Sequence, residues 1–321
     1  MEYLGIDVGS VSTDFVLMDE NLNIKEQLYL KTKGNPIGAI QEGMRRLDEQ
    51  KNIPEIRGVG VTGSGRSLAA VLVGADVIKN EITTHAVAAA ATDPEICTVL
   101  EIGGQDSKII LLRDGIISDF AMNTVCAAGT GSFLDRQAER LGLAVSELGE
   151  YAARAENPVR IAGRCAVFAE SDLIHKQQLG CSLEDIIAGM SEALVRNYLA
   201  NVAKGKQIKN KICFQGGVAA NEGIRRAFEK ALDAEVQVPK YHKVMGAYGA
   251  AILAKEKMEV SDELTAFRGF RAGSGTITSE TFRCGDCGNQ CEVTLLKEGE
   301  RQLGCFSDRC GKYQRSAALP L

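Results

Sequence analysis

The stretch LGIDVGSVSTDFVLMD, residues 4–19, contains two apolar runs joined by a turn with an aspartate, a glycine and a threonine. The stretch TVLEIGGQDSKIILLRD, residues 98–114, repeats this order. The corresponding positions are Asp7 with Glu101, Gly9 with Gly103, and Thr13 with Ser107. Two apolar runs separated by a glycine turn predict a β-hairpin, and the repetition predicts two related halves.

The rest of the chain alternates predicted strands and helices. Further strands are expected at 24–31, 57–61, 116–121, 212–215 and 235–238. Helices are expected at 37–50, 81–92, 131–141, 166–178, 183–204, 221–232 and 243–257. This mixed order predicts an α/β fold. Residues 258–283 are polar and contain Gly and Ser, so they are interpreted as a linker before a cysteine-rich module at 284–321.

Composition excludes several classes of protein. The chain has 321 residues, 45% of them hydrophobic, and a net charge of −5, which does not fit a basic nucleic-acid-binding surface. The N-terminal sequence reads directly as a strand, so no signal peptide is expected, and no apolar run is long enough for a membrane span. We therefore expect a cytoplasmic protein with reduced cysteines.

Four glycine turns are candidate phosphate-binding loops, because glycine lets the backbone approach a phosphate and turn N–H groups and hydroxyls bind its oxygens. The candidate nucleotide contacts are Gly9, Ser10, Ser12, Thr13, Gly103, Gly104, Ser107, Lys108, Gly216, Gly217, Val218, Asn221 and Gly246. Asp7 is a candidate Mg²⁺ ligand through water, and Asp106 a candidate to position water or Mg²⁺. Gln105 is a candidate to orient an attacking water. Each turn alone is equally consistent with an ordinary turn.

The order of these turns resembles the phosphate-1, connect-1, phosphate-2, adenosine and connect-2 elements of the actin, hexokinase and Hsp70 superfamily. The resemblance covers residues 1–257. It implies two ribonuclease-H-like lobes with ATP or ADP and Mg²⁺ in the cleft. Lobe I would span 1–97, completed by the helix at 243–257, and lobe II would span 98–242.

Two cysteines in the main body, Cys126 and Cys165, each precede a predicted helix. The free N–H groups and the dipole of a helix N-terminus favour a thiolate, which is the form that binds metal. Two thiolates do not complete a four-thiolate iron–sulfur cluster, but a two-fold axis between identical subunits would supply the other pair. The alternative is that both are buried as small apolar residues.

Three motifs, IGGQDSK, CAAGTGSFLD and GRCAVFAESD, resemble the activator components of 2-hydroxyacyl-CoA dehydratases, within the BadF/BadG/BcrA/BcrD ATPase family. The resemblance implies one 4Fe–4S cluster per homodimer, held by Cys126 and Cys165 of each subunit. It also implies ATP hydrolysis, a ferredoxin or flavodoxin electron donor, and an iron–sulfur partner enzyme: a dehydratase, or a related reductase with a double-cubane cluster. Neither a nucleic acid nor a membrane is an expected partner. By the same comparison Cys97, Cys181 and Cys213 have no role.

The last tenth of the chain carries five more cysteines, with a C-x2-C-x3-C run followed by two further cysteines. Such spacing favours structural zinc, with an iron–sulfur cluster or no metal as alternatives. The predicted ligands are Cys284, Cys287, Cys291 and Cys310, which leaves Cys305 spare. The predicted fold would then carry a small module of metal-ribbon type.

Two other functions fit the same fold. One is a small-molecule kinase such as a sugar kinase, although no sugar-binding motif is evident. The other is a regulatory ATPase without redox chemistry, which would use the cysteine-rich module to bind a partner. Iron binding through Cys126 and Cys165 separates the activator from both.

Overall fold

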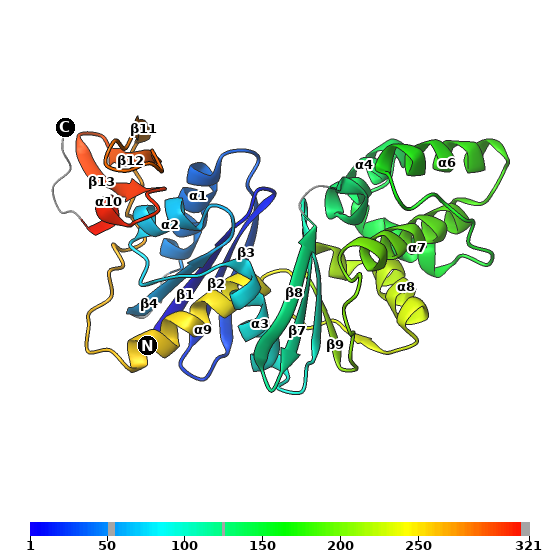
Figure 1. Ribbon diagram of the computed structural model, residues 1–321, viewed down its shortest axis with the longest axis horizontal. Helices are drawn as coiled ribbons and strands as arrows, with labels where there is room; N and C mark the ends of the chain where they lie inside the picture. The colour runs from blue at the N-terminus through cyan, green and yellow to red at the C-terminus, as the bar shows by residue number, and fades with distance from the viewer. Residues whose placement is uncertain (51–54, 124–125, 316–321) are drawn as a thin grey trace. The chain divides into compact units, whose positions relative to one another are not determined.

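The computed structural model describes residues 1–50, 55–123 and 126–315 of the chain. Their contacts form two compact units, each with its own strands and helices (Figure 1). Unit 1 comprises Met1–Thr84 and Gly246–Leu321, and unit 2 comprises His85–Met245.

The division between the units falls inside helix α3 (Glu81–Thr92), earlier than the expected boundary at residue 97. Most of α3 belongs to unit 2, where His85 Nδ1 lies 2.9 Å from Gln215 Oε1. This contact joins residues far apart in the sequence, and for that reason local pattern did not reveal it.

Unit 1 is built on a five-stranded sheet of order β3-β2-β1-β4-β5. The hairpin predicted at residues 4–19 is confirmed: β1 (Glu2–Val8) pairs antiparallel with β2 (Ser12–Asp19). The other strands are β3 (Ile24–Lys31), β4 (Ile56–Thr62) and β5 (Val77–Ile78), with β4 parallel to β1. Helices α1 (Pro36–Asp48) and α2 (Arg66–Val73) pack against this sheet.

Helix α9 (Met245–Glu259) lies directly against strands β1 and β4 of unit 1. A Cβ atom added to Gly5 would lie 1.8 Å from the carbonyl oxygen of Ala247, and one added to Gly60 would lie 2.0 Å from that of Ala250. Glycine at both positions therefore permits the close packing of helix on sheet.

Unit 2 repeats this topology in a sheet of order β10-β9-β6-β7-β8. Strands β6 (Thr98–Ile102), β7 (Ser107–Arg113) and β8 (Ile116–Asn123) are antiparallel neighbours, and β9 (Ile212–Gln215) and β10 (Val236–Gln237) are parallel to β6. The predicted repeat is thus confirmed at the level of strand order and direction.

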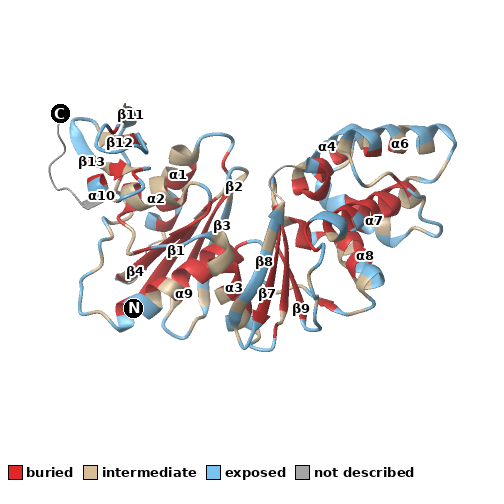
Figure 2. Cartoon of the chain, viewed as in Figure 1, coloured by how far each residue is buried: buried red, intermediate tan, exposed pale blue. Residues whose placement is uncertain are grey.

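Besides most of α3, unit 2 contains α4 (Gly131–Leu141), α5 (Leu148–Ala153), α6 (Ala166–Gln178), α7 (Leu183–Asn201) and α8 (Glu222–Leu232). In Figure 2, α7 and the central strands are largely buried, whereas α6 is mostly exposed. In the core, Phe228 makes edge contacts with Tyr198 and Phe214, each with ring centres 5.2 Å apart. The short elements α2, α5 and β5 were not predicted, because each offers too few residues for a periodic pattern.

The interpretation of residues 258–283 as a linker is wrong for the last part, because Ile277–Arg283 forms strand β11. With β12 (Glu292–Glu298) and β13 (Arg301–Phe306) it makes a three-stranded antiparallel sheet, which α10 (Lys312–Arg315) follows. We call residues 277–315 the terminal module. Residues 316–321 of the predicted module lie outside the described residues.

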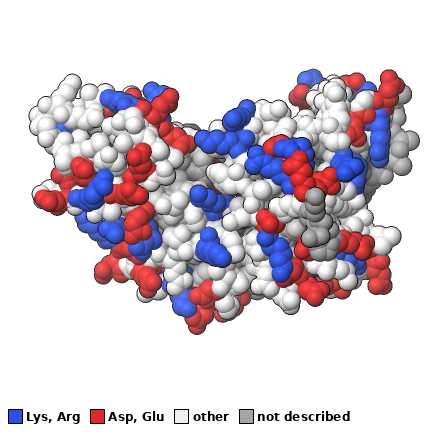
Figure 3. Space-filling model, turned by 180° about the vertical axis from the view of Figure 1, so that it is seen from behind, with Lys and Arg blue, Asp and Glu red and all other residues white. Residues whose placement is uncertain are grey.

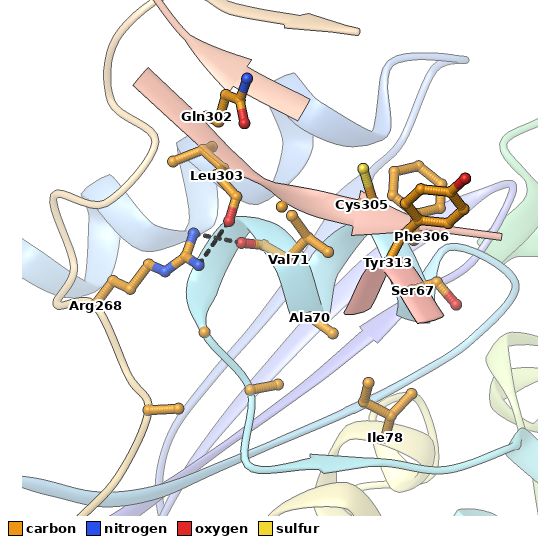
Figure 4. Close-up of a pocket in the computed structure, with 14 residues that line it drawn as sticks. Ser67, Ala70, Val71, Ile78, Arg268, Gln302, Leu303, Cys305, Phe306 and Tyr313 are labelled. Atoms are coloured by element: carbon orange, nitrogen blue, oxygen red, sulfur yellow. Dashed lines mark hydrogen bonds between the residues drawn. The ribbon is translucent and has the colours of Figure 1, made fainter. Parts of the chain in front are cut away.

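The segment before the terminal module packs against unit 1. The Arg268 guanidinium donates hydrogen bonds to the carbonyl oxygens of Val71 (2.7 Å) and Leu303 (2.9 Å), as Figure 4 shows. Phe267 and Phe270 pack against the apolar core of the unit. These anchors explain why a polar, glycine-bearing stretch is not a free linker. A pocket of about 420 Å³ remains between α2, this segment and the module.

Acidic and basic side chains are interspersed on the face seen in Figure 3, in agreement with the small net charge. Among the described residues, none of the helices combines the length and the apolar character that a membrane crossing needs.

Candidate functional site

The β1–β2 hairpin of unit 1 brings two aspartates together. Asp7 and Asp14 are cross-strand partners, and Asp14 is only 5% exposed. Ser12 Oγ donates to Asp14 Oδ2 at 3.3 Å, whereas Asp14 Oδ1 has no hydrogen-bond partner in the described part of the chain. Burial, and then the nearby charge of Asp7, raise the pKa of Asp14 well above its usual value. A buried carboxylate with one oxygen that lacks a hydrogen-bond partner, next to a second carboxylate, suits a hard cation such as Mg²⁺.

Asp14 was not singled out from the sequence. The signal was the hairpin itself, since the turn at Gly9 places Asp14 directly opposite Asp7. Within this turn, Gly9 N–H donates to the Ser12 carbonyl at 2.8 Å. Thr13, a predicted nucleotide contact, is fully buried and its hydroxyl lies 2.9 Å from that of Thr32, so it supports the turn. Ser10 is exposed.

A second loop of unit 1, residues 63–66, reaches the same hairpin and was missed in the sequence. Because β4 is parallel to β1, both strands end at the same edge of the sheet. Gly65 N–H donates to the Val8 carbonyl at 2.8 Å, and a Cβ added to Gly63 would lie 2.5 Å from Asp7 Oδ1. The available signal was a TGSG turn directly after a predicted strand.

The equivalent hairpin in unit 2 contains a buried ion-pair cluster. Lys108 Nζ donates to Glu101 Oε2 at 3.0 Å and to Asp106 Oδ1 at 2.8 Å. Glu101 and Lys108 are almost fully buried. Burial raises the pKa of Glu101, and the positive charge of Lys108 opposes this shift. Lys108 was predicted to contact phosphate, but in this structure its ammonium group binds two carboxylates.

The turn between β6 and β7 holds the remaining predicted residues of this hairpin. Gly103 N–H donates to the Asp106 carbonyl at 3.0 Å, which closes the turn, and Gln105 is exposed on it. The Ser107 hydroxyl is buried and has no hydrogen-bond partner among the described residues. Gln105 and Asp106 are therefore placed on an accessible turn, as a role in positioning water requires.

The third glycine turn follows β9 in unit 2. Gly216 has φ +90°, and a Cβ there would lie 2.7 Å from Glu101 Oε1, so the turn needs glycine. Gly217 and Val218 begin a 3₁₀ turn that leads to Asn221. Asn221 Oδ1 caps α8 by accepting from Ile224 N–H at 3.1 Å, while its amide nitrogen is buried without a partner among the described residues.

The fourth glycine turn was predicted at residues 246–251. The structure places Gly246 in the first turn of α9, within unit 1.

Cys126 and Cys165 lie close together in unit 2. Cys126 Sγ is 3.9 Å from the carbonyl oxygen of Arg164, and both thiols are partly exposed. Cys165 is the N-cap of α6, as predicted, but Cys126 precedes a three-residue 3₁₀ turn and not α4 itself. Only Cys165 therefore has the helix N-terminal position that the sequence predicted for both cysteines. Asn123 orients Cys126, with its side chain bonded to both the N–H and the carbonyl of that residue.

Exposed apolar side chains occur after Cys165 in the chain and on the strand before Cys126. Val167 and Phe168, in the first turn of α6, are 69% and 67% exposed. Phe120 and Met122, on the edge strand β8 that leads toward Cys126, are also exposed. Val167 and Phe168, which follow Cys165 closely in the chain, are an exposed apolar pair of the kind found at contact surfaces.

The cysteines of the terminal module divide into two groups. Cys284 and Cys305 are buried in a small core with Val293, Leu295 and Tyr313. Cys291 packs at its edge, whereas Cys287 and Cys310 are exposed. Within residues 1–50, 55–123 and 126–315, no three His, Cys, Asp or Glu side chains are arranged to hold a metal ion. The four predicted zinc ligands are therefore not brought together in this structure.

Comparison with known proteins gives a consistent result. Residues 4–254 match the BadF/BadG/BcrA/BcrD ATPase family. The (R)-2-hydroxyglutaryl-CoA dehydratase activating ATPase of Acidaminococcus fermentans is 36% identical over 79% of this chain and 97% of its own length. The solved structure of component A of that dehydratase has a TM-score of 0.73 at 34% identity, covering 81% of this chain and 99% of the other.

The activator of 2-hydroxyisocaproyl-CoA dehydratase from Clostridium difficile, solved with bound ADPNP, has the same TM-score at 32% identity over 81% of this chain and 96% of the other. The predicted actin/hexokinase/Hsp70-like α/β fold is confirmed by the solved structures that the chain resembles. The family match ends before the terminal module begins.

Proposed function

We propose, because this chain belongs to the BadF/BadG/BcrA/BcrD ATPase family, that it is an ATP-hydrolysing activator that donates one electron to an iron–sulfur partner enzyme. Relatives of this chain are activators of 2-hydroxyacyl-CoA dehydratases. The partner we favour is such a dehydratase or a related double-cubane reductase. The observation that supports the proposal is the 3.9 Å contact of Cys126 Sγ with the carbonyl oxygen of Arg164, the residue before Cys165, and the partial exposure of both thiols.

We propose that each unit has its own candidate residues for binding the nucleotide. In unit 1, Asp7 and Asp14 would hold Mg²⁺, and Gly9 and Ser10 would face phosphate. Among the described residues Asp14 Oδ1 has no hydrogen-bond partner, which supports the Mg²⁺ site. In unit 2, the Gly103–Gly104 turn would bind phosphate through its backbone. Gln105 and Asp106 on this turn would orient the attacking water. A relative solved with bound ADPNP supports nucleotide binding of this type.

The cysteine pair supplies two thiolates, which is half of the set that a 4Fe–4S cluster requires. A second copy of the chain, related by a two-fold axis, would supply the other two, so one cluster would belong to a homodimer. The exposed side chains of Val167 and Phe168 support such an interface, because dimerisation would remove them from water. The bound cluster would accept a low-potential electron from ferredoxin or flavodoxin and pass it to the partner enzyme.

ATP matters to this function only if it binds one conformation of the dimer more tightly than another. We propose that Mg-ATP favours the conformation that docks on the partner enzyme, and that hydrolysis returns the chain to the other one. The residues that would sense the γ-phosphate are those of the Gly103–Gly104 turn, next to Gln105 and Asp106. The difference in affinity between the two conformations sets how strongly ATP drives electron transfer.

The test is the iron content of protein reconstituted without oxygen. We expect about four iron atoms per dimer in the wild type, and loss of nearly all of that iron in Cys126→Ala and in Cys165→Ala. Cys181→Ala is the matched control, since Cys181 is also a partly exposed thiol of unit 2 and should keep the iron. Iron that survives both substitutions, or a wild type that takes up none, would refute the electron-donor function and favour a kinase or a regulatory ATPase.

A further inference from the structure

The loop that carries Cys126 is joined to the predicted phosphate turn. This loop, residues 126–130, leads into the N-terminus of α4. There the N–H groups of Gly131 and Ser132 donate to the carbonyl oxygens of Gly103 and Gly104, both at 2.8 Å. The Ser132 hydroxyl adds a bond of 2.6 Å to Gly104. The start of α4 is thus fixed to the turn between β6 and β7 by three hydrogen bonds.

The loop that carries Cys165, residues 161–165, is joined to the same hairpin by another route. Asn197 Nδ2, on α7, donates to the Gly163 carbonyl at 2.5 Å. The next residue, Tyr198, donates from its hydroxyl to the carbonyl oxygen of Lys108 at 2.6 Å. Lys108 lies on strand β7, so this second connection ends on the strand and not on the turn.

Asn197 also lies against the Cys126 loop. A Cβ atom added to Gly129 would be 3.0 Å from Asn197 Oδ1, so this amide packs between the two cysteine loops. Asn197 and Tyr198 are almost fully buried. A buried polar group that loses its partner costs about 1–3 kcal/mol, so such contacts resist being broken. The two loops are therefore held at defined places relative to the hairpin.

We propose that Ser132 and Asn197 are positioning residues through which nucleotide at the β6–β7 turn changes the relative setting of Cys126 and Cys165; this inference rests on the proposed function. The two connections have different origins. The Cys126 loop is bonded to the turn, which would touch the phosphate, and would move with it. The Cys165 loop is connected through α7 to strand β7 and would move with that strand. A displacement of the turn relative to the strand then moves one thiol with respect to the other. Hydrogen bonds, together with the backbone of α7 between Asn197 and Tyr198, provide a physical path for this coupling.

The experiment uses the full chain without a cluster, in reduced form. Each cysteine's rate of alkylation by iodoacetamide is followed by mass spectrometry, with and without Mg-ADPNP. In the wild type we expect ADPNP to change the rate at Cys126 relative to Cys165 by about fivefold or more. Ser132→Ala should reduce this change to roughly twofold or less, because it removes the hydroxyl bond to Gly104.

Asn197→Asp removes the amide donor to Gly163 and should raise the alkylation rate of Cys165 whether or not ADPNP is present. The matched control is Ser191→Ala. The Ser191 hydroxyl is also buried and also donates to a backbone carbonyl, but that carbonyl, Ile187, belongs to the same helix. This control should keep the wild-type response to ADPNP.

A wild-type response in both Ser132→Ala and Asn197→Asp would overturn the inference, as would a wild type that binds ADPNP without any change in alkylation. ADPNP affinity, from a binding titration, and iron content after reconstitution are measured on the same preparations. Loss of either in the wild type means that the proposed function has failed, and the inference with it. Normal values of both, with an unaltered response in the variants, mean that the inference alone has failed.

Discussion

Lys108 is a buried cation whose ammonium group binds two carboxylates, Glu101 and Asp106. Removing one partner of a buried ion pair leaves an uncompensated charge, which costs about 3–5 kcal/mol. We expect Lys108→Met to lower the free energy of unfolding, measured in urea, by roughly 3 kcal/mol or more. Adding Glu101→Gln should restore part of this loss, because the buried negative charge then disappears.

The control for Lys108 is Lys206→Met. Lys206 pairs with the half-exposed Asp119, and such pairs contribute about 1 kcal/mol or less. Equal losses of stability in the two single variants would show that the pairs around Lys108 are not the stabilising contacts that their burial implies.

Asp14 makes stability depend on pH because burial raises its pKa well above the usual value. Between the unfolded and folded pKa values, the folded state holds a proton that the unfolded state has released. Stability therefore falls as the pH rises through this window and stays lower above it. Asp14→Asn should remove this loss and raise the Tm of the nucleotide-free chain at pH 7 by about 2–4 °C.

The gain from Asp14→Asn should be much smaller at pH 4, where this carboxyl group is already about half protonated in the unfolded chain. The stabilisation by Mg-ADPNP should shrink in the same variant, because a ligand of Mg²⁺ is lost. Thermal melts at pH 4 and 7, with and without Mg-ADPNP, check both points. An unchanged shift by Mg-ADPNP would remove Asp14 from the Mg²⁺ site.

At the scale of elements, the terminal module adds a second sheet to unit 1. Leu296 and Leu303 of its strands reach the core of that unit, so the module does not depend on a core of its own. Its inner cluster is small and contains Cys284 and Cys305. A bound metal would add folding energy to such a small cluster.

Metal in the terminal module stays a prediction. We expect the chain with Cys126→Ala and Cys165→Ala to retain about one zinc ion per molecule, measured by elemental analysis. Adding Cys287→Ser should remove the zinc, since Cys287 belongs to the predicted ligand set. Cys305→Ser should leave it in place, because Cys305 lies outside that set. Iron in place of zinc would favour a second iron–sulfur cluster, and a metal-free module would contradict the prediction.

For the whole molecule, the proposed dimer requires that the surface around Cys126 and Cys165 be covered by a second copy. Phe168→Asp places a charge on this surface at a residue that is 67% exposed, so the fold of the single chain should survive. We expect this variant to sediment as a monomer and to take up little iron. Leu264→Asp is the control, since Leu264 is 91% exposed in unit 1 and should leave the dimer intact. A dimeric, iron-loaded Phe168→Asp protein would place the interface elsewhere.

Local sequence pattern was enough to predict the two hairpins, most helices and the repeat that relates the halves. These features depend on the alternation of apolar residues and on glycine turns, which neighbouring residues encode. The residue motifs around Cys126 and Cys165 were likewise sufficient to identify the family, whereas the role of the two cysteines stays a prediction.

Other features exist only once distant segments are packed together. The pairing of Asp14 with Asp7 depends on hairpin register, and the ion pairs of Lys108 depend on burial of the whole β6–β7 hairpin. The contact of Cys126 with the Arg164 carbonyl and the hydrogen bond of Asn197 to Gly163 join loops and a helix that are far apart in the chain. The packing of the polar segment after residue 257 was missed for the same reason: its partners lie in α1, β4, α2 and β13, and the composition of a segment does not reveal such distant contacts.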